Sequence, residues 1–237
     1  MILALLACTT VTGPPEEEKL ATVSHQVTFE SITRLGPHRL DLTARHERQS
    51  GDRTEGFVIV WGGWDDFQVV RSRQGQITQD TRVLSGKAYT STDGEIFHPQ
   101  DDAELYRTDL ATTWNEWDRQ LEPVLGALVL TADRETVVEG RPAQRYLVSM
   151  DPEFVATGRN ADVPTALSGH LTVDSGSGVR LVGEVHGEYL QNGDPEKPST
   201  VTLNLLRTGL GEDVTIEPPT AFPTKKGKRR KKAKKPD

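Results

Sequence analysis

Nucleophiles and potential metal ligands are few and scattered in this chain of 237 residues. None of the motifs Gly-x-Ser-x-Gly, Gly-x-Gly-x-x-Gly, His-Glu-x-x-His or the P-loop occurs. The histidines at positions 25, 38, 46, 98, 170 and 186 lack metal-ligand spacing, and we expect His170 and His186 to face solvent on the polar face of one hairpin. The pairs Asp65-Asp66 and Asp101-Asp102 are interpreted as a turn and a helix start, because no spaced ring of oxygen ligands accompanies them. The sequence therefore predicts no enzyme activity, no metal and no cofactor.

The reactive side chain with the most informative position is the thiol of Cys8. It is the one cysteine of the sequence, so it cannot form a disulfide within the chain, and it ends the apolar run Met1-Ile-Leu-Ala-Leu-Leu-Ala7. The stretch Leu5-Leu6-Ala7-Cys8 resembles the lipobox of bacterial lipoproteins, whose cysteine receives a diacylglyceryl group and becomes the mature N-terminus. The resemblance implies that residues 1–7 are a signal-peptide remnant, since a bilayer span takes about 20 residues. The alternative is a hydrophobic N-terminal segment with an incidental buried cysteine.

Residues 8–22 are predicted to be a flexible tether that carries the lipid. They contain turn formers and charge, among them Gly13-Pro14-Pro15, and show no apolar periodicity. In lipoproteins of enteric bacteria, an Asp directly after the lipidated cysteine is the signal for retention in the inner membrane, and this chain has Thr9 at that position. The resemblance therefore implies a protein of the bacterial cell envelope, lipid-anchored in the outer membrane and facing the periplasm.

The C-terminal end is strongly basic. Residues 225–237 carry nine Lys or Arg and one Asp, a net charge of +8, and subtracting this from the formal −7 of the chain leaves −15 for residues 1–224. Repulsion at this charge density opposes folding, so we predict that residues 223–237 are disordered. Three roles stay open: a solvated tail without a partner, a contact with anionic lipid or lipopolysaccharide phosphate, and a nucleic-acid arm, which the lipobox makes the least favoured. The candidate anion-binding residues are Lys225, Lys226, Lys228, Arg229, Arg230, Lys231, Lys232, Lys234 and Lys235.

Between these ends, residues 23–222 form a body long enough for a single β-rich domain with a sizeable core. Its clearest pattern is in Val179 to Tyr189, where the odd positions are apolar or Gly and the even ones mostly polar, as in a half-buried antiparallel strand. Leu171 to Asp174 is its predicted hairpin partner across a Gly-containing turn. A third strand, residues 201–205, has apolar odd positions. Together these strands predict a meander with one apolar face.

The N-terminal half shows further strand patterns. We expect strands at Val23–Ile32, with Val27 and Phe29 pointing inward, and at Leu40–His46, with no helix before the first strand. Residues 57–61 and 67–70 are apolar on both faces, which predicts a hairpin covered on both sides by protein, or on one side by protein and on the other by a ligand. Trp61 and Trp64 at its turn are expected to be partly buried, the alternative being an exposed tip that enters a membrane. Short strands are expected at residues 76–84, 87–90 and 95–98.

One segment breaks the β pattern. Apolar residues recur every three or four positions from residue 101 to 130, the spacing of an amphipathic helix: Leu110, Trp114, Trp117, Leu121, Leu125 and Leu128. Because Pro123 cannot occupy a helix interior without loss of a hydrogen bond, we predict one helix over about 102–121 and a second near Pro123. The apolar stripe is expected to meet the concave side of the sheet, since the opposite face carries Arg107, Asp109, Asn115, Glu116, Asp118 and Arg119.

The chain is thus expected to contain a long meander, then a helical segment, then a closing meander, behind a lipobox. This order resembles that of the superfamily of the lipoprotein carrier LolA, its anchored receptor LolB and the mycobacterial lipid-binding lipoproteins LppX and LprG. The likeness is carried by Val138–Val148, Gly169–Asp174, Gly178–Leu181 and Glu212–Pro218, and spans most of residues 23–219. It implies a mainly β fold: a curved antiparallel sheet that forms a half or unclosed barrel, covered by one kinked helical segment. It also implies an apolar cavity that holds acyl chains.

The predicted sheet is large and has one apolar face, and a single helical segment is expected to cover it. Part of the apolar face would then stay uncovered, which favours a cavity for lipid. Burial of an acyl chain there is favourable by about 0.8 kcal/mol per methylene. The candidate ligand-binding residues are Trp114, Trp117, Leu121, Leu125, Phe57, Ile59 and Trp61. The alternative is a core that these side chains fill at ordinary density. The sequence thus predicts lipid carriage or lipoprotein trafficking, with an acyl-chain or lipoprotein ligand, or else a ligand-free anchored scaffold that uses its basic tail.

Overall fold

The structure, a computed structural model, describes residues 17–19, 27–158 and 160–222. The strands are β1 (Glu17–Lys19), β2 (His38–Glu47), β3 (Arg53–Gly63), β4 (Asp66–Arg73), β5 (Gln76–Leu84), β6 (Lys87–Ser91), β7 (His98–Gln100), β8 (Leu128–Val138), β9 (Arg141–Met150), β10 (Val163–Asp174), β11 (Arg180–Leu190) and β12 (Pro198–Thr208). The helices are α1 (Phe29–Leu35), α2 (Glu104–Trp114), α3 (Glu116–Gln120) and α4 (Glu122–Leu125), with a 3₁₀ turn at Gln191–Gly193.

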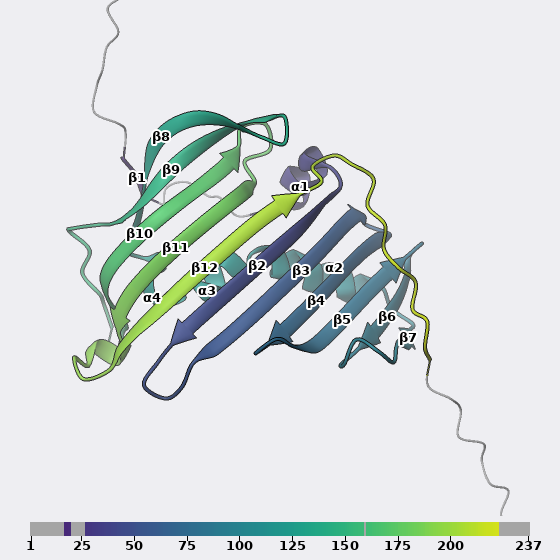
Figure 1. Ribbon diagram of the computed structural model, residues 1–237, viewed down its shortest axis with the longest axis horizontal. Helices are drawn as coiled ribbons and strands as arrows, with labels where there is room; N and C mark the ends of the chain where they lie inside the picture. Colours follow the sequence, from purple (N-terminus) through teal and green to yellow (C-terminus); the bar gives the residue numbers. More distant parts are fainter. Residues whose placement is uncertain (1–16, 20–26, 159, 223–237) are drawn as a thin grey trace, which may run out of the picture.

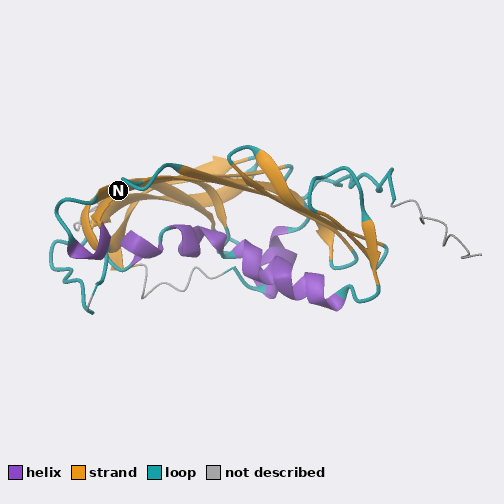
Figure 2. Cartoon of the chain, turned by 90° about the horizontal axis from the view of Figure 1, so that it is seen from below, coloured by secondary structure: helices purple, strands orange, loops and turns teal. Residues whose placement is uncertain are grey.

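All twelve strands belong to one antiparallel sheet with the order β1-β8-β9-β10-β11-β12-β2-β3-β4-β5-β6-β7 (Figure 1). The sheet is not closed, since β1 and β7 lie at its two ends and do not pair with each other. Seen from the side, the sheet is an arch with the helices along its concave face (Figure 2). These features confirm the predicted mainly β fold with an unclosed antiparallel sheet and a helical cover on the concave side.

The predicted C-terminal meander is confirmed as β10, β11 and β12. The odd residues of β11 from Leu181 to Tyr189 are buried, and Val201, Leu203 and Leu205 of β12 continue the same buried face. Gly178 closes the β10–β11 turn with a φ of +72°, a conformation that glycine adopts without steric cost. Alternation of apolar and polar residues therefore decides both the strands and the face that each one buries.

The last strand closes the sheet onto the first half of the chain. β12 pairs with β2, with Leu205 opposite Leu42 and Leu203 opposite Ala44. The first half then continues as hairpins from β2 to β6, in agreement with the strands expected at residues 40–46, 57–61, 67–70, 76–84 and 87–90. The expected strand at residues 95–98 is displaced to β7, because the carboxylate of Asp93 accepts the backbone N–H groups of Glu95 and Ile96 and holds that segment as a loop.

The prediction of a strand over Val23–Ile32 with no helix before the first long strand is wrong for the described residues of that segment, which begin helix α1. Thr28 caps this helix: its Oγ1 accepts the backbone N–H of Ser31, and the Ser31 Oγ accepts that of Thr28. Ile32 and Leu35, three positions apart, are buried, whereas Phe29, predicted to point inward, is half exposed. The period-two pattern was too short to distinguish a strand from one helical face.

The helices α2, α3 and α4, called the helical cover below, replace the single helix predicted over residues 102–121. The helix breaks at Asn115. The side-chain Oδ1 of Asn115 accepts the backbone N–H of Val27 at 3.0 Å, and its Nδ2 donates to the Val27 carbonyl oxygen at 3.3 Å. The second start near Pro123 is confirmed, since Pro123 lies in the first turn of α4. Leu128, predicted to extend the helical stripe, instead begins β8.

Strand β1 lies within residues 8–22, the predicted flexible tether, yet it pairs with β8, placing Glu17 opposite Thr131. Cys8 and residues 223–237 lie outside the described residues, so lipidation and a disordered tail stay predictions. Among the residues that the structure describes, no helix has the length and apolar character needed to cross a membrane.

Candidate functional site

The helical cover meets the concave sheet face through the residues that the sequence predicted as ligand-binding. Trp117, Leu121 and Ile59 are at most 1% exposed, and Trp114, Phe57 and Trp61 at most 5%. Leu125 is partly buried against the same hydrophobic cluster. The structure thus brings all seven together, and in this conformation their side chains pack against one another as a core.

Tryptophan rings join the helical cover to the β3–β4 hairpin. The Trp61 ring lies 5.3 Å from that of Trp114 and 5.2 Å from that of Trp64, in edge-to-face geometry. Trp64 also packs on Phe29 of α1, so Trp64 is partly buried at the boundary of the core, as expected, and the alternative of an exposed tip is wrong. The indole N–H groups of Trp114 and Trp117 are buried and lack an acceptor among the described residues, although buried indoles usually find one.

The cover packs directly on glycines of β11. A Cβ added at Gly183 would lie 2.6 Å from the Trp117 ring, and one added at Gly187 would lie 3.1 Å from Val124. Both glycines occupy inward positions of the alternating pattern. Their missing side chains therefore make the space into which α3 and α4 insert, which explains why this part of the apolar face contains Gly in place of larger residues.

A buried polar network crosses the same interface. His46 Nε2 donates to Gln120 Oε1 at 2.9 Å, and Gln120 Nε2 donates to Glu55 at 3.0 Å and to Glu116 at 3.3 Å. Burial alone would raise the pKa of Glu55, but hydrogen bonds from Arg53, Gln120 and Arg73 outweigh it and lower that pKa. Burial lowers the pKa of His46. The network therefore holds a charged carboxylate and a neutral imidazole at neutral pH.

A second network contains two buried arginines. Arg207 donates to His38 Nε2 at 2.7 Å and to the carbonyl oxygen of Arg180 at 2.8 Å, and Arg180 donates to Asp118 of α3 at 2.8 Å. Because a guanidinium can only donate, His38 must accept at Nε2 and donate from Nδ1 to the Gly36 carbonyl oxygen, 2.8 Å away. Burial, reinforced by the charge of Arg207, lowers the pKa of His38 to about 3.

Burial also determines the charge state of the cations in this second network. It lowers the pKa of Arg207 to about 9, with the charge of Arg180 acting in the same direction. It lowers the pKa of Arg180 as well, against the attraction of Asp118, and it raises the pKa of Asp118 against the attraction of Arg180. Because a guanidinium stays protonated in folded proteins, Arg180 and Arg207 are two buried cations beside a neutral His38, and the partly buried Asp118 pairs with Arg180.

Two open pockets of the described chain lie beside the helical cover. One, of about 340 Å³, lies beside the cover and is lined by Arg53, Glu55, Phe57, Arg71, Ser72, Arg73, Thr78, Glu116 and Arg119. Another, of about 450 Å³, lies at α4 and includes Pro123 and Phe154. Of the predicted ligand-binding residues, Phe57 borders the first of these pockets.

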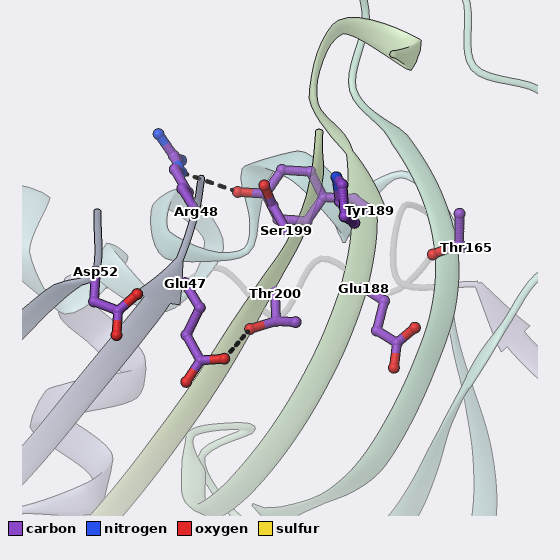
Figure 3. Close-up of a pocket in the computed structure, with 9 residues that line it drawn as sticks. Glu47, Arg48, Asp52, Thr165, Glu188, Tyr189, Ser199 and Thr200 are labelled. Atoms are coloured by element: carbon purple, nitrogen blue, oxygen red, sulfur yellow. Dashed lines mark hydrogen bonds between the residues drawn. The ribbon is translucent and has the colours of Figure 1, made fainter. Parts of the chain in front are cut away.

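A third pocket, of about 320 Å³, lies where β2 and β11 end and β12 begins (Figure 3). Arg48 Nε donates to the Tyr189 hydroxyl at 3.1 Å, and the Thr200 hydroxyl donates to Glu47 at 3.3 Å. Glu188 and Asp52 make the rest of this surface acidic. Glu47, Arg48, Asp52 and Glu188 place charged groups around this pocket, which does not favour an acyl chain. Within the described residues no group of three or more His, Cys, Asp or Glu could hold a metal ion.

The polar residues of the two networks were missed or misplaced by the sequence analysis. Glu116 and Asp118 were expected on the solvent face of the helix, but Glu116 is buried and Asp118 bonds Arg180. On α3 the buried face is wider than the predicted apolar stripe, since Glu116 and Gln120 are buried beside Trp117. A signal for Arg207 did exist: it continues the buried odd positions of β12.

No protein-family model matches the chain, and no curated protein was found to match its sequence. Three solved structures resemble the fold. MucB has a TM-score of 0.31 and 13% identity over 78% of this chain, and the match spans 58% of MucB, under two thirds of its length. A LolA superfamily protein from Nitrosomonas europaea has a TM-score of 0.23 and 7% identity, over 78% of this chain and 88% of that one. A DUF1329 family protein from Desulfovibrio piger has a TM-score of 0.26 and 10% identity, over 79% and 89%.

Proposed function

We propose that this protein is a bacterial envelope module that binds acyl chains between the concave face of its sheet and the helical cover, for lipid carriage or lipoprotein trafficking. The observation that supports it most is the composition of that interface. Trp114, Trp117 and Leu121 of the cover and Ile59 and Trp61 of the sheet form one apolar surface. Separation of the cover would expose this surface, and an acyl chain would bury it again at about 0.8 kcal/mol per methylene.

The construction of the helical cover supports a separable interface. Its helices are 11, 5 and 4 residues long, and none begins with a side-chain cap hydrogen bond. Helices of this length are marginal by themselves and depend on tertiary packing for stability. The cover is therefore stable while it packs on the sheet, and opens at its breaks near Asn115 and Leu121 with little loss of helical hydrogen bonding.

Decanoate binding to the purified full chain tests this function. We expect decanoate to change tryptophan fluorescence, and native mass spectrometry to show the bound acid or a co-purified lipid. Trp117→Ala should weaken binding, whereas Leu105→Ala, on the exposed side of α2, should leave it unchanged. A spectrum unaffected by decanoate, together with a lipid-free mass, would refute the proposal.

A second candidate function is an anchored scaffold without a ligand. The burial of the predicted ligand-binding side chains supports this candidate, since six of them are at most 5% exposed and pack in one core. In that case Trp117→Ala should cost about 3–5 kcal/mol of stability, the usual range for loss of a buried large aromatic side chain. Chemical denaturation of the variant, run beside the decanoate titration, distinguishes the two functions.

A further inference from the structure

The arginine network contains more positive charge than its described neighbours neutralise. Arg180 and Arg207 are 2% and 1% exposed, and Asp118 is bonded to Arg180 but not to Arg207, whose partners are His38 and the Arg180 carbonyl oxygen. His38, which accepts from Arg207, is neutral. Among the described residues, two buried cations thus lie beside one carboxylate, which pairs with Arg180, although buried charges are normally paired because an unpaired one is costly.

Arg180 also has hydrogen-bonding capacity to spare. Its Nε and Nη1 atoms are buried without an acceptor among the described residues, and Nη2 alone bonds Asp118. A guanidinium has five N–H donors and ordinarily places them on oxygen acceptors. The spare donors belong to Arg180, and the charge without a carboxylate belongs to Arg207, whose Nε bonds the backbone carbonyl oxygen of Arg180. An oxyanion bound to Arg180 would use these donors and lie near both charges.

The position of Arg180 connects this site to the apolar interface. The Arg180 guanidinium lies 5.8 Å from the centre of the Trp117 ring. Asp118 follows Trp117 on α3, so the same short helix supplies both an apolar residue of the interface and the carboxylate of the ion pair. Movement of α3 away from the sheet would therefore remove the Trp117 ring and the Asp118 carboxylate from Arg180 at the same time.

We propose that Arg180, supported by Arg207, binds the carboxylate of a fatty acid whose aliphatic chain lies along the apolar interface. This inference rests on the proposed function and specifies its ligand as a single aliphatic chain that ends in one negative charge. In the closed conformation Asp118 occupies part of the position that the carboxylate of the ligand takes. The chain contributes apolar burial, and the carboxylate gives selectivity over neutral lipids, because leaving a buried charge without a partner is costly.

Decanoate and decan-1-ol, which have equal chain length and differ in charge, test the inference on the full chain. We expect the wild type to bind decanoate at least about tenfold more tightly, the ratio expected of one hydrogen bond to a charged group. Arg180→Met should reduce this ratio to about one by loss of decanoate affinity. Arg39→Met, which removes an exposed arginine on β2, should preserve the ratio. Equal binding of acid and alcohol by the wild type would overturn the inference and leave acyl-chain binding standing, whereas no binding of either would overturn the proposed function itself.

Asp118→Asn provides a test that does not depend on the folding of Arg180→Met. It removes the carboxylate that competes with the ligand while it keeps the size of the side chain. We therefore expect Asp118→Asn to increase the ratio of decanoate to decan-1-ol affinity above that of the wild type. An unchanged or smaller ratio would contradict the role of Asp118 as the group that the ligand replaces.

Discussion

At the scale of single residues, the unusual feature is the number of polar side chains at inward positions of the strands. His38 and His46 of β2, Glu55 of β3 and Arg207 of β12 all follow the alternation of their strands into the interior. Each has hydrogen-bond partners there, so the desolvation cost is offset locally. Their charge states, unlike those of exposed groups, are coupled to folding.

His38 should make the protein less stable in acid. Its pKa is about 3 in the folded protein against 6.5 for the free side chain, so between these values the unfolded chain binds a proton that the folded chain does not. The stability from a neutral His38 is complete above about pH 6.5 and falls by about 1.4 kcal/mol per unit as the pH decreases toward 3. From about pH 7.5 to 4.5 we expect a loss of roughly 2–3 kcal/mol from this residue, measured by urea denaturation.

The His38→Gln variant isolates this effect from other groups that titrate in acid. A glutamine keeps an acceptor for Arg207 and a donor for the Gly36 carbonyl oxygen, and has no charge at any pH. The decrease in stability with acid should therefore be smaller in the variant by about the same 2–3 kcal/mol. Parallel curves for the two proteins would show that His38 is not held neutral by the fold.

At the scale of elements, the contact between β11 and the helical cover determines how closely the cover approaches the sheet. Trp117 and Val124 lie over Gly183 and Gly187, where any larger side chain would meet them. Close approach of α3 is also what brings Asp118 to Arg180. The two glycines therefore position both the apolar interface and the ion pair.

Gly183→Ala should destabilise the fold by overpacking. The added Cβ would lie 2.6 and 2.8 Å from two carbons of the Trp117 ring and 3.0 Å from Leu171, so the indole must move. We expect a loss of about 1–3 kcal/mol, the usual cost of an extra methyl group in a packed core, measured by urea denaturation.

Gly176→Ala is the matched control for Gly183→Ala. Its added Cβ would meet no atom closer than Asp174 Oδ2 at 3.4 Å, an ordinary contact, so we expect a change within about 0.5 kcal/mol. Equal effects of the two substitutions would mean that α3 does not pack tightly on β11.

At the scale of the whole molecule, the described chain begins and ends at opposite edges of the sheet (Figure 1). β1 forms one edge, paired with β8. The C-terminal segment crosses to the other edge. There the Arg82 side chain donates to the carbonyl oxygen of Glu217, and the backbone N–H of Phe97 donates to the carbonyl oxygen of Ala221. A lipid at Cys8 and a membrane-binding tail would thus act on different edges of the domain.

Deletion of residues 223–237 should separate membrane binding from folding. The described contacts of Glu217 and Ala221 are retained, so we expect an unchanged thermal midpoint. If the basic tail binds anionic lipid through charge, a chain without the lipid anchor should bind phosphatidylglycerol vesicles, and this binding should fall as salt rises, since charges are screened within about 8 Å at physiological ionic strength. The deletion should abolish it. Binding that persists at high salt would assign the contact to another surface.

Lipidation of Cys8 is tested by metabolic labelling in a bacterial host. A palmitate analogue should label the wild type and should not label Cys8→Ser, because the chain has no other cysteine. Fractionation of the same cells tests the outer-membrane location. Equal labelling of the two chains would exclude a thioether-linked lipid at this position.

The sequence by itself determined the elements whose signal is local. Alternation in residues 179–189 and 201–205 predicted β11 and β12 and the face that each buries, because a strand places successive side chains on opposite sides. The spacing of Trp114, Trp117 and Leu121 likewise predicted a helical segment on the concave side of the sheet. The same alternation, continued along β12 to position 207, would also have placed Arg207 in the interior.

Tertiary structure alone decided the features that depend on partners far apart in the chain. Pairing of β12 with β2 joins residues 160 or so positions apart, and no local pattern encodes the choice of that neighbour. Asn115, where the helix breaks, bonds Val27, which is 88 positions away in the chain, and Asp118, predicted to face solvent, bonds Arg180, which is 62 positions away. Such contacts depend on where two separate elements meet in space, so the pattern of residues 101–130 predicted the buried Trp114, Trp117 and Leu121 but not the partner of Asp118.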